Sequence, residues 1–157
     1  MWRQTLQNYG DRPALTFEVA NNVWKSLTYK QYYDECIKFG KACIAVGLSH
    51  FAPVMIIGFN SPEWVTSFYG AIFGHFLPIG LYTTNSAETC EYIANHCAGE
   101  IAIVEDKVQL QKYVKIIKKC PSIKYLVIYK EAVPTDLPSE LKGRVFTWAE
   151  FLQKGEK

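Results

Sequence analysis

Short apolar runs alternate along the chain with segments in which apolar residues recur every three or four positions. Residues 54–58, 101–105 and 125–129 are nearly continuous apolar runs, as is typical of strands covered on both faces. Residues 77–81 form a further strand candidate, although Pro78 favours a strand start or a sheet edge. The intervening segments 62–75, 87–97 and 108–117 have helical spacing, and Pro121 ends the last. A strand–helix unit repeating every ~23 residues predicts an α/β fold with a mostly parallel sheet, flanking helices and right-handed crossovers.

The first strong helix start lies at residues 27–31, LTYKQ. Thr28 is a good N-cap, and Gln31 stands where a capping box needs it. Leu27 and Tyr32 have the spacing of a hydrophobic staple. Gly47 is a natural stop. The core-facing stripe predicted for this helix consists of Tyr33, Cys36, Ile37, Gly40, Cys43, Ile44 and Gly47.

Other caps and turns divide the rest of the chain. Residues 14–18 and 23–27 predict a hairpin, because Asn21 and Asn22 between them tolerate left-handed backbone geometry. Residues 131–142 contain two prolines among polar residues and predict a surface loop. Thr147 and Glu150 repeat the capping-box spacing before a short final helix.

Composition excludes several classes of protein. The chain has 157 residues, of which 49% are hydrophobic and 20% charged, so it is globular rather than disordered. A net charge of +2 gives no reason to expect a nucleic-acid partner. The chain has neither a secretory signal pattern nor an apolar run long enough to span a bilayer, so we expect a cytoplasmic location.

The five cysteines, Cys36, Cys43, Cys90, Cys97 and Cys120, include no C-x-x-C pair. Two pairs are seven residues apart, which on a helix is roughly 10 Å, too far for a disulfide or a shared metal. We expect small core residues in a reducing compartment and no metal site.

No phosphate-binding motif occurs in the chain. Neither G-x-G-x-x-G nor G-x-x-x-x-G-K-[ST] is present, and the turns after the predicted strands read FNSPEW, YTTNSAE and EDKVQ. An independent flavodoxin-like nucleotide binder therefore ranks last among the possible functions.

Three polar groups could bind a ligand or simply serve the fold. Thr83, Thr84, Asn85 and Ser86 follow a strand, and capping is the favoured interpretation over a ligand site. The second group is Asn60, Glu63 and Trp64, which we interpret as a helix cap with the Trp64 indole packed on the core. A basic cluster could contact an anionic membrane or phosphates, but we interpret it as a solvated helix face. Its members are Lys112, Lys115, Lys118, Lys119, Lys124 and Lys130.

Several motifs in order resemble the adenylate-forming (AMP-binding) superfamily. Leu27, Thr28, Tyr29 and Gln31 match the form L-T-Y-x-E/Q-L, with Tyr32 where leucine is usual. The segment N-x-P-E-W is matched by Asn60, Pro62, Glu63 and Trp64, and YGDRPAL at 9–15 matches the usual lead-in. A looser match to a second core motif comprises Ala71, Gly74, Pro78, Tyr82 and 83–88.

Within that superfamily, residues 9–151 most resemble long-chain fatty acyl-CoA synthetases of the bubblegum type. At the positions of His75 and Phe76 members of the family usually have small residues. The difference affects either the local packing or the path of the acyl chain. The resemblance implies 1–157 as a partial N-terminal domain, with a lead-in hairpin at 9–28 and a repeating strand–helix core at 28–130.

The resemblance also implies a reaction. In such enzymes a long-chain fatty acid carboxylate attacks the α-phosphate of Mg-ATP, and coenzyme A then displaces AMP from the acyl-adenylate. The family uses a T-S-G-T-T-G loop, nucleoside-binding segments and a mobile C-terminal domain with a catalytic lysine. None of these occurs in residues 1–157. We therefore assign no catalytic, cofactor-binding or metal-binding residue, and expect ATP, Mg²⁺ and coenzyme A to bind the parent enzyme rather than this chain.

Two hypotheses follow. In the first, the chain is an N-terminal fragment of a fatty acid–CoA ligase, inactive alone, whose partners are the fatty acid and the remainder of the synthetase. In the second, it is a non-catalytic lipid-binding or regulatory module that pairs with a full-length synthetase. Peripheral membrane contact is compatible with both. The first also predicts an apolar surface left without a partner.

Overall fold

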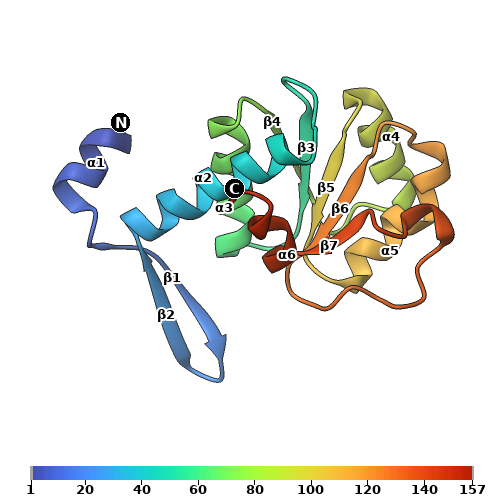
Figure 1. Cartoon of the computed structure of the whole chain (residues 1–157). Helices are drawn as coiled ribbons and strands as arrows, with labels where there is room; N and C mark the ends of the chain where they lie inside the picture. The colour runs from blue at the N-terminus through green and yellow to red at the C-terminus, as the bar shows by residue number, and fades with distance from the viewer. Residues whose placement is uncertain (1, 157) are drawn as a thin grey trace.

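The computed structural model, which describes residues 2–156, contains a five-stranded, fully parallel sheet (Figure 1). Its strands in spatial order are β4 (Leu77–Leu81), β3 (Pro53–Ile57), β5 (Ile101–Val104), β6 (Tyr125–Ile128) and β7 (Val145–Thr147). The predicted α/β class is confirmed. Pro78 lies in the edge strand β4, as its missing N–H predicted.

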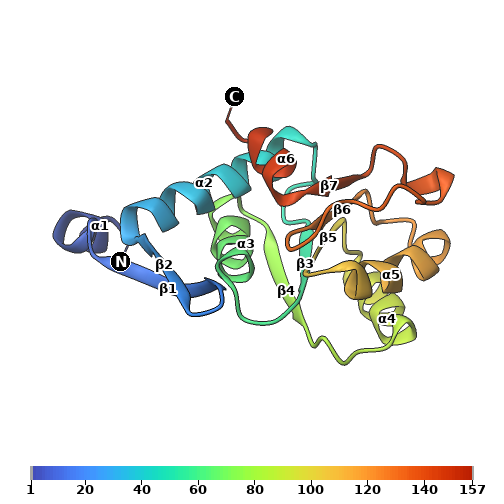
Figure 2. The same cartoon turned by 90° about the horizontal axis from the view of Figure 1, so that it is seen from below.

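Helices cover both faces of this sheet (Figure 2). On one face lie α2 (Tyr29–Ala45), α3 (Pro62–Phe73) and α6 (Trp148–Gln153), and on the other lie α4 (Ala87–Cys97) and α5 (Lys107–Ile116). Val54 and Ile56 of β3 pack in the hydrophobic core on the side of α2, α3 and α6. Met55 and Ile57 pack in the core on the side of α4 and α5. Continuous apolar runs were therefore the correct sign of a strand buried on both faces.

The predicted caps are largely confirmed. Thr28 and Gln31 form the complete capping box of α2, and Thr147 and Glu150 form that of α6. Ser61 caps α3 and Ser86 caps α4, and in each case the serine hydroxyl accepts the N–H of the third helical residue. The chain leaves α2 through Gly47 at φ +75°, the left-handed geometry that glycine accepts most easily.

The predicted stripe on α2 was wrong in part. Ile44 is 60% exposed and Tyr33 only half-buried, whereas Tyr32, Phe39 and Ala42 are buried. The buried face is rotated because α2 packs against α6 as well as α3, and Phe39 contacts Phe151 of α6 at 5.4 Å between ring centroids. Spacing alone could not show this second neighbour.

Two further elements were not predicted. Helix α1 (Trp2–Tyr9) has no buried residue, and the indole of Trp2 anchors it at 5.3–5.7 Å from the rings of Tyr32, Tyr33, Tyr69 and Phe73. Strand β7 is only three residues long, too short for a periodic signal. Residues 131–142 form a loop, as predicted, but it includes the 3-10 turn η2 (Ser139–Leu141), which buries Leu141. A second 3-10 turn, η1 (Ile117–Lys119), extends α5.

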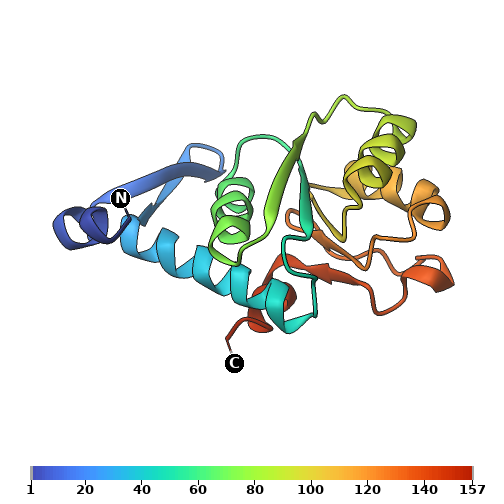
Figure 3. The same ribbon diagram turned by 90° about the horizontal axis from the view of Figure 1, so that it is seen from above.

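The hairpin forms a separate two-stranded sheet of β1 (Pro13–Ala20) and β2 (Val23–Thr28). Asn21 and Asn22 make its turn with φ of 29° and 65°, as the sequence predicted. Figures 1 and 3 show the hairpin and α1 at the far end of α2, away from the five-stranded sheet. Val23 and Trp24 are 54% and 60% exposed.

Within residues 2–156, no helix has the length and apolar character needed to cross a bilayer.

Candidate functional site at the carboxyl ends of the strands

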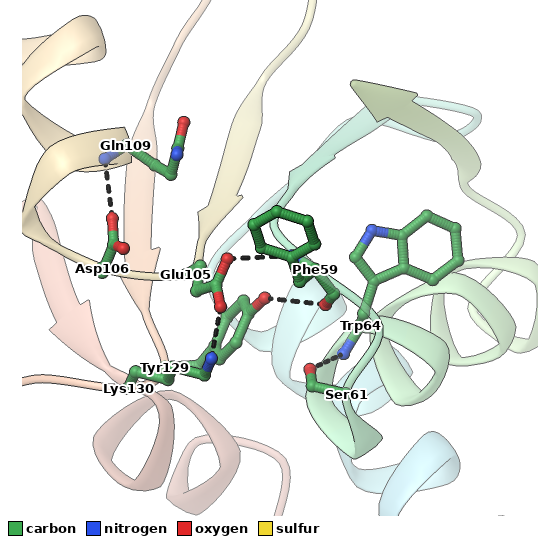
Figure 4. Close-up of polar contacts among 8 residues, drawn as sticks. All are labelled: Phe59, Ser61, Trp64, Glu105, Asp106, Gln109, Tyr129 and Lys130. Atoms are coloured by element: carbon green, nitrogen blue, oxygen red, sulfur yellow. Dashed lines mark hydrogen bonds and ion pairs between the residues drawn. The ribbon is translucent and has the colours of Figure 1, made fainter. Parts of the chain in front are cut away.

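The order of the strands reverses direction at β3. The chain passes from β3 to β4 on one side, and then returns to β5 on the other side of β3. In parallel α/β sheets, the turns that follow the two strands at such a reversal lead to opposite faces of the sheet. A crevice opens between these turns, at the carboxyl ends of the strands, and ligands bind in it. The candidate site is therefore the carboxyl edge of β3, β4, β5 and β6 (Figure 4).

A crevice of about 430 Å³ opens at the ends of β3 and β4. Its lining residues carry no charge, and they are Gly58, Phe59, Asn60, Trp64, Gly80, Leu81, Tyr82 and Thr83. A side chain at position 80 would meet the ring of Trp64 at 3.3 Å, so the glycine lets the indole lie against β4. The side chains of Phe59 and Tyr82 are 69% and 81% exposed at the rim. The crevice suits an uncharged group.

Glu105, immediately after β5, closes the switch point beside this crevice. The residue is only 4% exposed. Its Oε2 accepts the backbone N–H of Phe59 at 2.9 Å, and its Oε1 pairs with the ammonium of Lys130 (Figure 4). A buried carboxylate needs such partners. Glu105 thereby ties the turn after β3 to the end of β6.

Tyr129 completes the same junction from β6. Its hydroxyl donates to the carbonyl oxygen of Phe59 at 3.5 Å, so both backbone groups of Phe59 are bound by side chains that directly follow β5 and β6. Burial raises the pKa of Tyr129, which keeps the hydroxyl protonated as a donor. Gly58 leaves room for this contact, because a Cβ at this position would overlap the hydroxyl of Tyr129.

The helix starts at this edge already have their own partners. The N–H of Trp64 is bound by Ser61 at 3.1 Å, and the N–H of Gln109 by Asp106 at 2.9 Å. The N–H of Lys107 donates to Glu131 at 3.1 Å. These donors are thus satisfied by side chains of the chain itself, and a buried carboxylate lies between them. The residues present do not fit the triphosphate of ATP.

The sequence-predicted polar groups serve mainly the fold. In the turn 82–86, Ser86 caps α4, and the carbonyl oxygen of Thr83 accepts from Lys112 at 2.6 Å. Tyr82 lines the crevice and is largely exposed. Trp64 packs on the core, as predicted, and stacks on Phe68 with ring centroids 5.7 Å apart, yet it also lines the crevice.

The basic cluster is more than a solvated face. Lys118, Lys119 and Lys124 form ion pairs with Glu140, Glu91 and Glu100 at 2.9, 3.2 and 2.9 Å. Lys130 pairs with buried Glu105, and Lys112 holds the turn after β4. The interpretation as a solvated face was therefore incomplete: these lysines remain partly exposed, but carboxylates from other segments pair with Lys118, Lys119, Lys124 and Lys130.

Sequence reasoning missed Glu105 and Tyr129. Each directly follows or ends an apolar strand run, and an acidic residue immediately after a buried strand was the available signal. Phe76, which departs from the resembled pattern, is buried at 5% exposure, and His75 adopts a left-handed φ of 62°.

The cysteines are free, and all but the half-buried Cys97 are buried. Burial raises the pKa of Cys36 to about 12 and also raises that of Cys43, so these thiols stay protonated. Across residues 2–156, no group of three or more His, Cys, Asp or Glu side chains could hold a metal ion. The cysteines act as small core residues, as their spacing indicated.

Comparison with known proteins supports the resemblance. Residues 2–152 match the family model described as AMP-binding enzyme. The chain is 40% identical over 157 residues to a long-chain-fatty-acid–CoA ligase, ACSBG2, of Gallus gallus, and 38% identical over 156 residues to ACSBG2 of Xenopus laevis. In both cases 99% of this chain is matched, but it spans only 20% of the relative's length.

Solved structures agree in fold. The AMP-bound adenylation domain of a carboxylic acid reductase from Segniliparus rugosus superposes with a TM-score of 0.79 over 98% of this chain and 29% of that one, at 17% identity. An anthranilate CoA ligase bound to anthranoyl-AMP gives 0.73 over 81% of this chain and 23% of that one, at 24% identity. Because the family model covers nearly all of the described residues, this chain belongs to the family of AMP-binding enzymes.

Proposed function

We propose that this chain forms part of the large domain of a long-chain fatty acid–CoA ligase, and that it supplies scaffold rather than the reactive centre. The observation that carries the proposal is its 35–40% identity, over almost the whole chain, to proteins named as such ligases. The chain spans about a fifth of their length, so most of a ligase of that size has no counterpart in it.

The chemistry of the switch point supports a scaffold role. The N–H groups that could hold phosphate oxygens are bound by Glu105, Ser61, Asp106 and Glu131, and no glycine-rich turn replaces them. We therefore propose that ATP, Mg²⁺ and coenzyme A act in the whole ligase, and that this chain alone does not activate fatty acids.

An ATP–pyrophosphate exchange assay with palmitate tests this function. We expect no exchange from the purified 157-residue chain, and robust exchange from the full-length Gallus gallus ligase under the same conditions. Exchange that co-purifies with the 157-residue chain and persists through a second, orthogonal purification would refute the proposal.

A second candidate is a non-catalytic module that binds lipid or pairs with a full-length synthetase. The open, uncharged crevice beside Phe59 and Tyr82 favours it. It predicts concentration-dependent association with the full-length ligase and partial quenching of the chain's tryptophan fluorescence by a brominated fatty acid. The absence of both effects would remove it.

A further inference from the structure

The β1–β2 hairpin is the least supported part of the fold. It forms its own two-stranded sheet, and five of the eight residues of β1 are exposed. A two-stranded hairpin is marginally stable in water unless a third strand or a helix supports it. One end contacts α2, but the turn half, with Val19 at 44% and Trp24 at 60% exposure, has no such cover.

A groove of about 340 Å³ runs beside β1. One wall consists of four consecutive strand residues, Ala14, Leu15, Thr16 and Phe17, and the other of Asn60, Ser61, Pro62 and Val65 at the start of α3. Alternate residues of a strand point to opposite faces, and Leu15, Thr16 and Phe17 pair in continuous register with β2. A groove lined by consecutive residues therefore lies along the backbone edge of β1 and not on one of its faces.

The backbone of Thr16 points toward that groove. Thr16 and Ser26 are opposite each other, and their hydroxyl oxygens lie 2.8 Å apart. Side chains come this close in non-hydrogen-bonded pairs, whose N–H and C=O groups point away from the partner strand. Thr28, two residues after Ser26 on β2, follows the same pattern. Its N–H donates to the side chain of Gln31 and not to Pro13, with which Thr28 is paired. The N–H and C=O of Thr16 thus face the free edge.

The edge lacks the usual protection over residues 15–17. Natural edges are blocked by proline, charge or bulges. A register shift lies between Pro13 and Leu15 at one end of the groove, and Glu18 follows at the other end, but residues 15–17 contain no proline, charge or register shift. The opposite edge, on β2, carries Lys25. The β1 edge thus combines an unblocked backbone over residues 15–17 with a groove of matching position.

The groove continues toward the candidate site. Asn60 lines both the groove and the crevice at the ends of β3 and β4. A segment lying along β1 would therefore pass Asn60 and reach the switch point, where Glu105 and Tyr129 hold the backbone of Phe59.

We propose that the β1 edge is a strand-addition site, occupied by an extended, largely uncharged segment from the remainder of a fatty acid–CoA ligase polypeptide. The proposal rests on the proposed function for its occupant. Relatives about five times longer supply ample chain for such a segment, and the groove accepts it by main-chain hydrogen bonds, as in other cases of β-augmentation.

The test uses the complete 157-residue chain and a version of the Gallus gallus ligase that lacks the segment matching this chain. Binding is measured by calorimetry, and exchange of single amides by NMR. In the free chain we expect the Thr16 amide to exchange quickly and the Phe17 amide slowly. On binding, the Thr16 amide should become protected.

Two matched variants separate the edges of the hairpin. Thr16→Pro removes an N–H from the groove edge, and Ser26→Pro removes the corresponding N–H from the opposite edge of the same residue pair. We expect Thr16→Pro to weaken binding about tenfold and Ser26→Pro to leave it within about twofold. Val65→Glu, which charges the far wall without touching the hairpin, should also weaken binding about tenfold.

Each other outcome counts against the proposal. Absence of binding, binding without protection of Thr16, or equal effects of both proline variants would overturn it. Self-association of the chain that Thr16→Pro abolishes would make a second copy the occupant and would also overturn it. Acyl-adenylate formation by the mixture is scored separately: docking without it contradicts the proposed function, and adenylate formation without Thr16 protection contradicts only the strand-addition site.

Discussion

The hydroxyl of Tyr129 occupies the space that any side chain at position 58 would need. Gly58 ends the run that forms β3, and Tyr129 ends the run that forms β6, although β5 lies between these strands in the sheet. The contact is possible because the turn after β3 bends over the end of β5. It sets the path of the chain into the candidate crevice.

Gly58→Ala should destabilise the chain by about 2 kcal/mol, because the overlap of its Cβ with the half-buried Tyr129 forces the ring to move. Urea unfolding measures the loss. Tyr129→Phe removes the overlapping oxygen, so the double variant should lose less than the sum of the two single variants. Strict additivity would show that the two residues do not contact each other in solution.

Lys130→Met should cost about 2 kcal/mol, because it leaves the carboxylate of Glu105 buried without its cation. The matched control is Lys107→Met at the same edge, whose partner Glu131 is itself exposed, and we expect a change below about 0.5 kcal/mol. Free energies of unfolding from denaturant titration decide the comparison. Equal effects of the two variants would contradict the burial argument.

The loss of folding stability at acid pH should depend on Glu100. Its burial alone would raise the pKa, but hydrogen bonds from Ser49 and Lys124 outweigh this and lower the pKa below 4.5. A carboxylate with a lowered pKa in the folded state stabilises the fold above the unfolded value, and this stabilisation is lost as pH falls through the folded value.

Glu100→Gln should therefore lower stability at pH 7 and make it less dependent on pH below about 4.5. Thermal unfolding from pH 3 to pH 7 measures the difference (roughly the range in which carboxylates titrate). Parallel curves for the variant and the original chain would exclude Glu100 as a source of the acid sensitivity.

Arg144→Lys should loosen the loop before β7. The guanidinium donates to the carbonyl oxygens of Lys124 at 2.8 Å and Glu140 at 3.0 Å, and also to that of Ile123. An ammonium group cannot reproduce this fork, and we expect a loss of about 2 kcal/mol. Limited proteolysis should cut residues 131–143 faster, while cleavage in the β1–β2 turn serves as an internal control and stays unchanged.

Local chemistry was enough to predict most helices and strands. Thr28 with Gln31, and Thr147 with Glu150, start helices through contacts only three residues long, and these contacts form in any context that allows a helix. Likewise, the apolar run at 101–104 can lie only where both faces are covered. Strand β7 and helix α1 lacked such signals, because distant partners hold them.

The candidate site was less predictable. Glu105, Tyr129 and Lys130 lie in or beside segments with ordinary strand and loop composition, and their roles arise only when parallel strands bring their carboxyl ends together. The lysines illustrate the same limit, since the acidic residues that pair with Lys119 and Lys124 come from other segments. Pairwise distances across the sheet are not encoded in local spacing.

By itself, the sequence determined the α/β class, the capped helices, the two-faced strands and the family resemblance, because each rests on short-range backbone chemistry or on motif order. Only the tertiary structure decided which polar groups meet at the switch point, that a groove borders the β1 edge of the hairpin, and where Asn60 joins the groove to the crevice. These features depend on the order in which strands add to the sheet, and that order is set by packing between elements far apart in the chain.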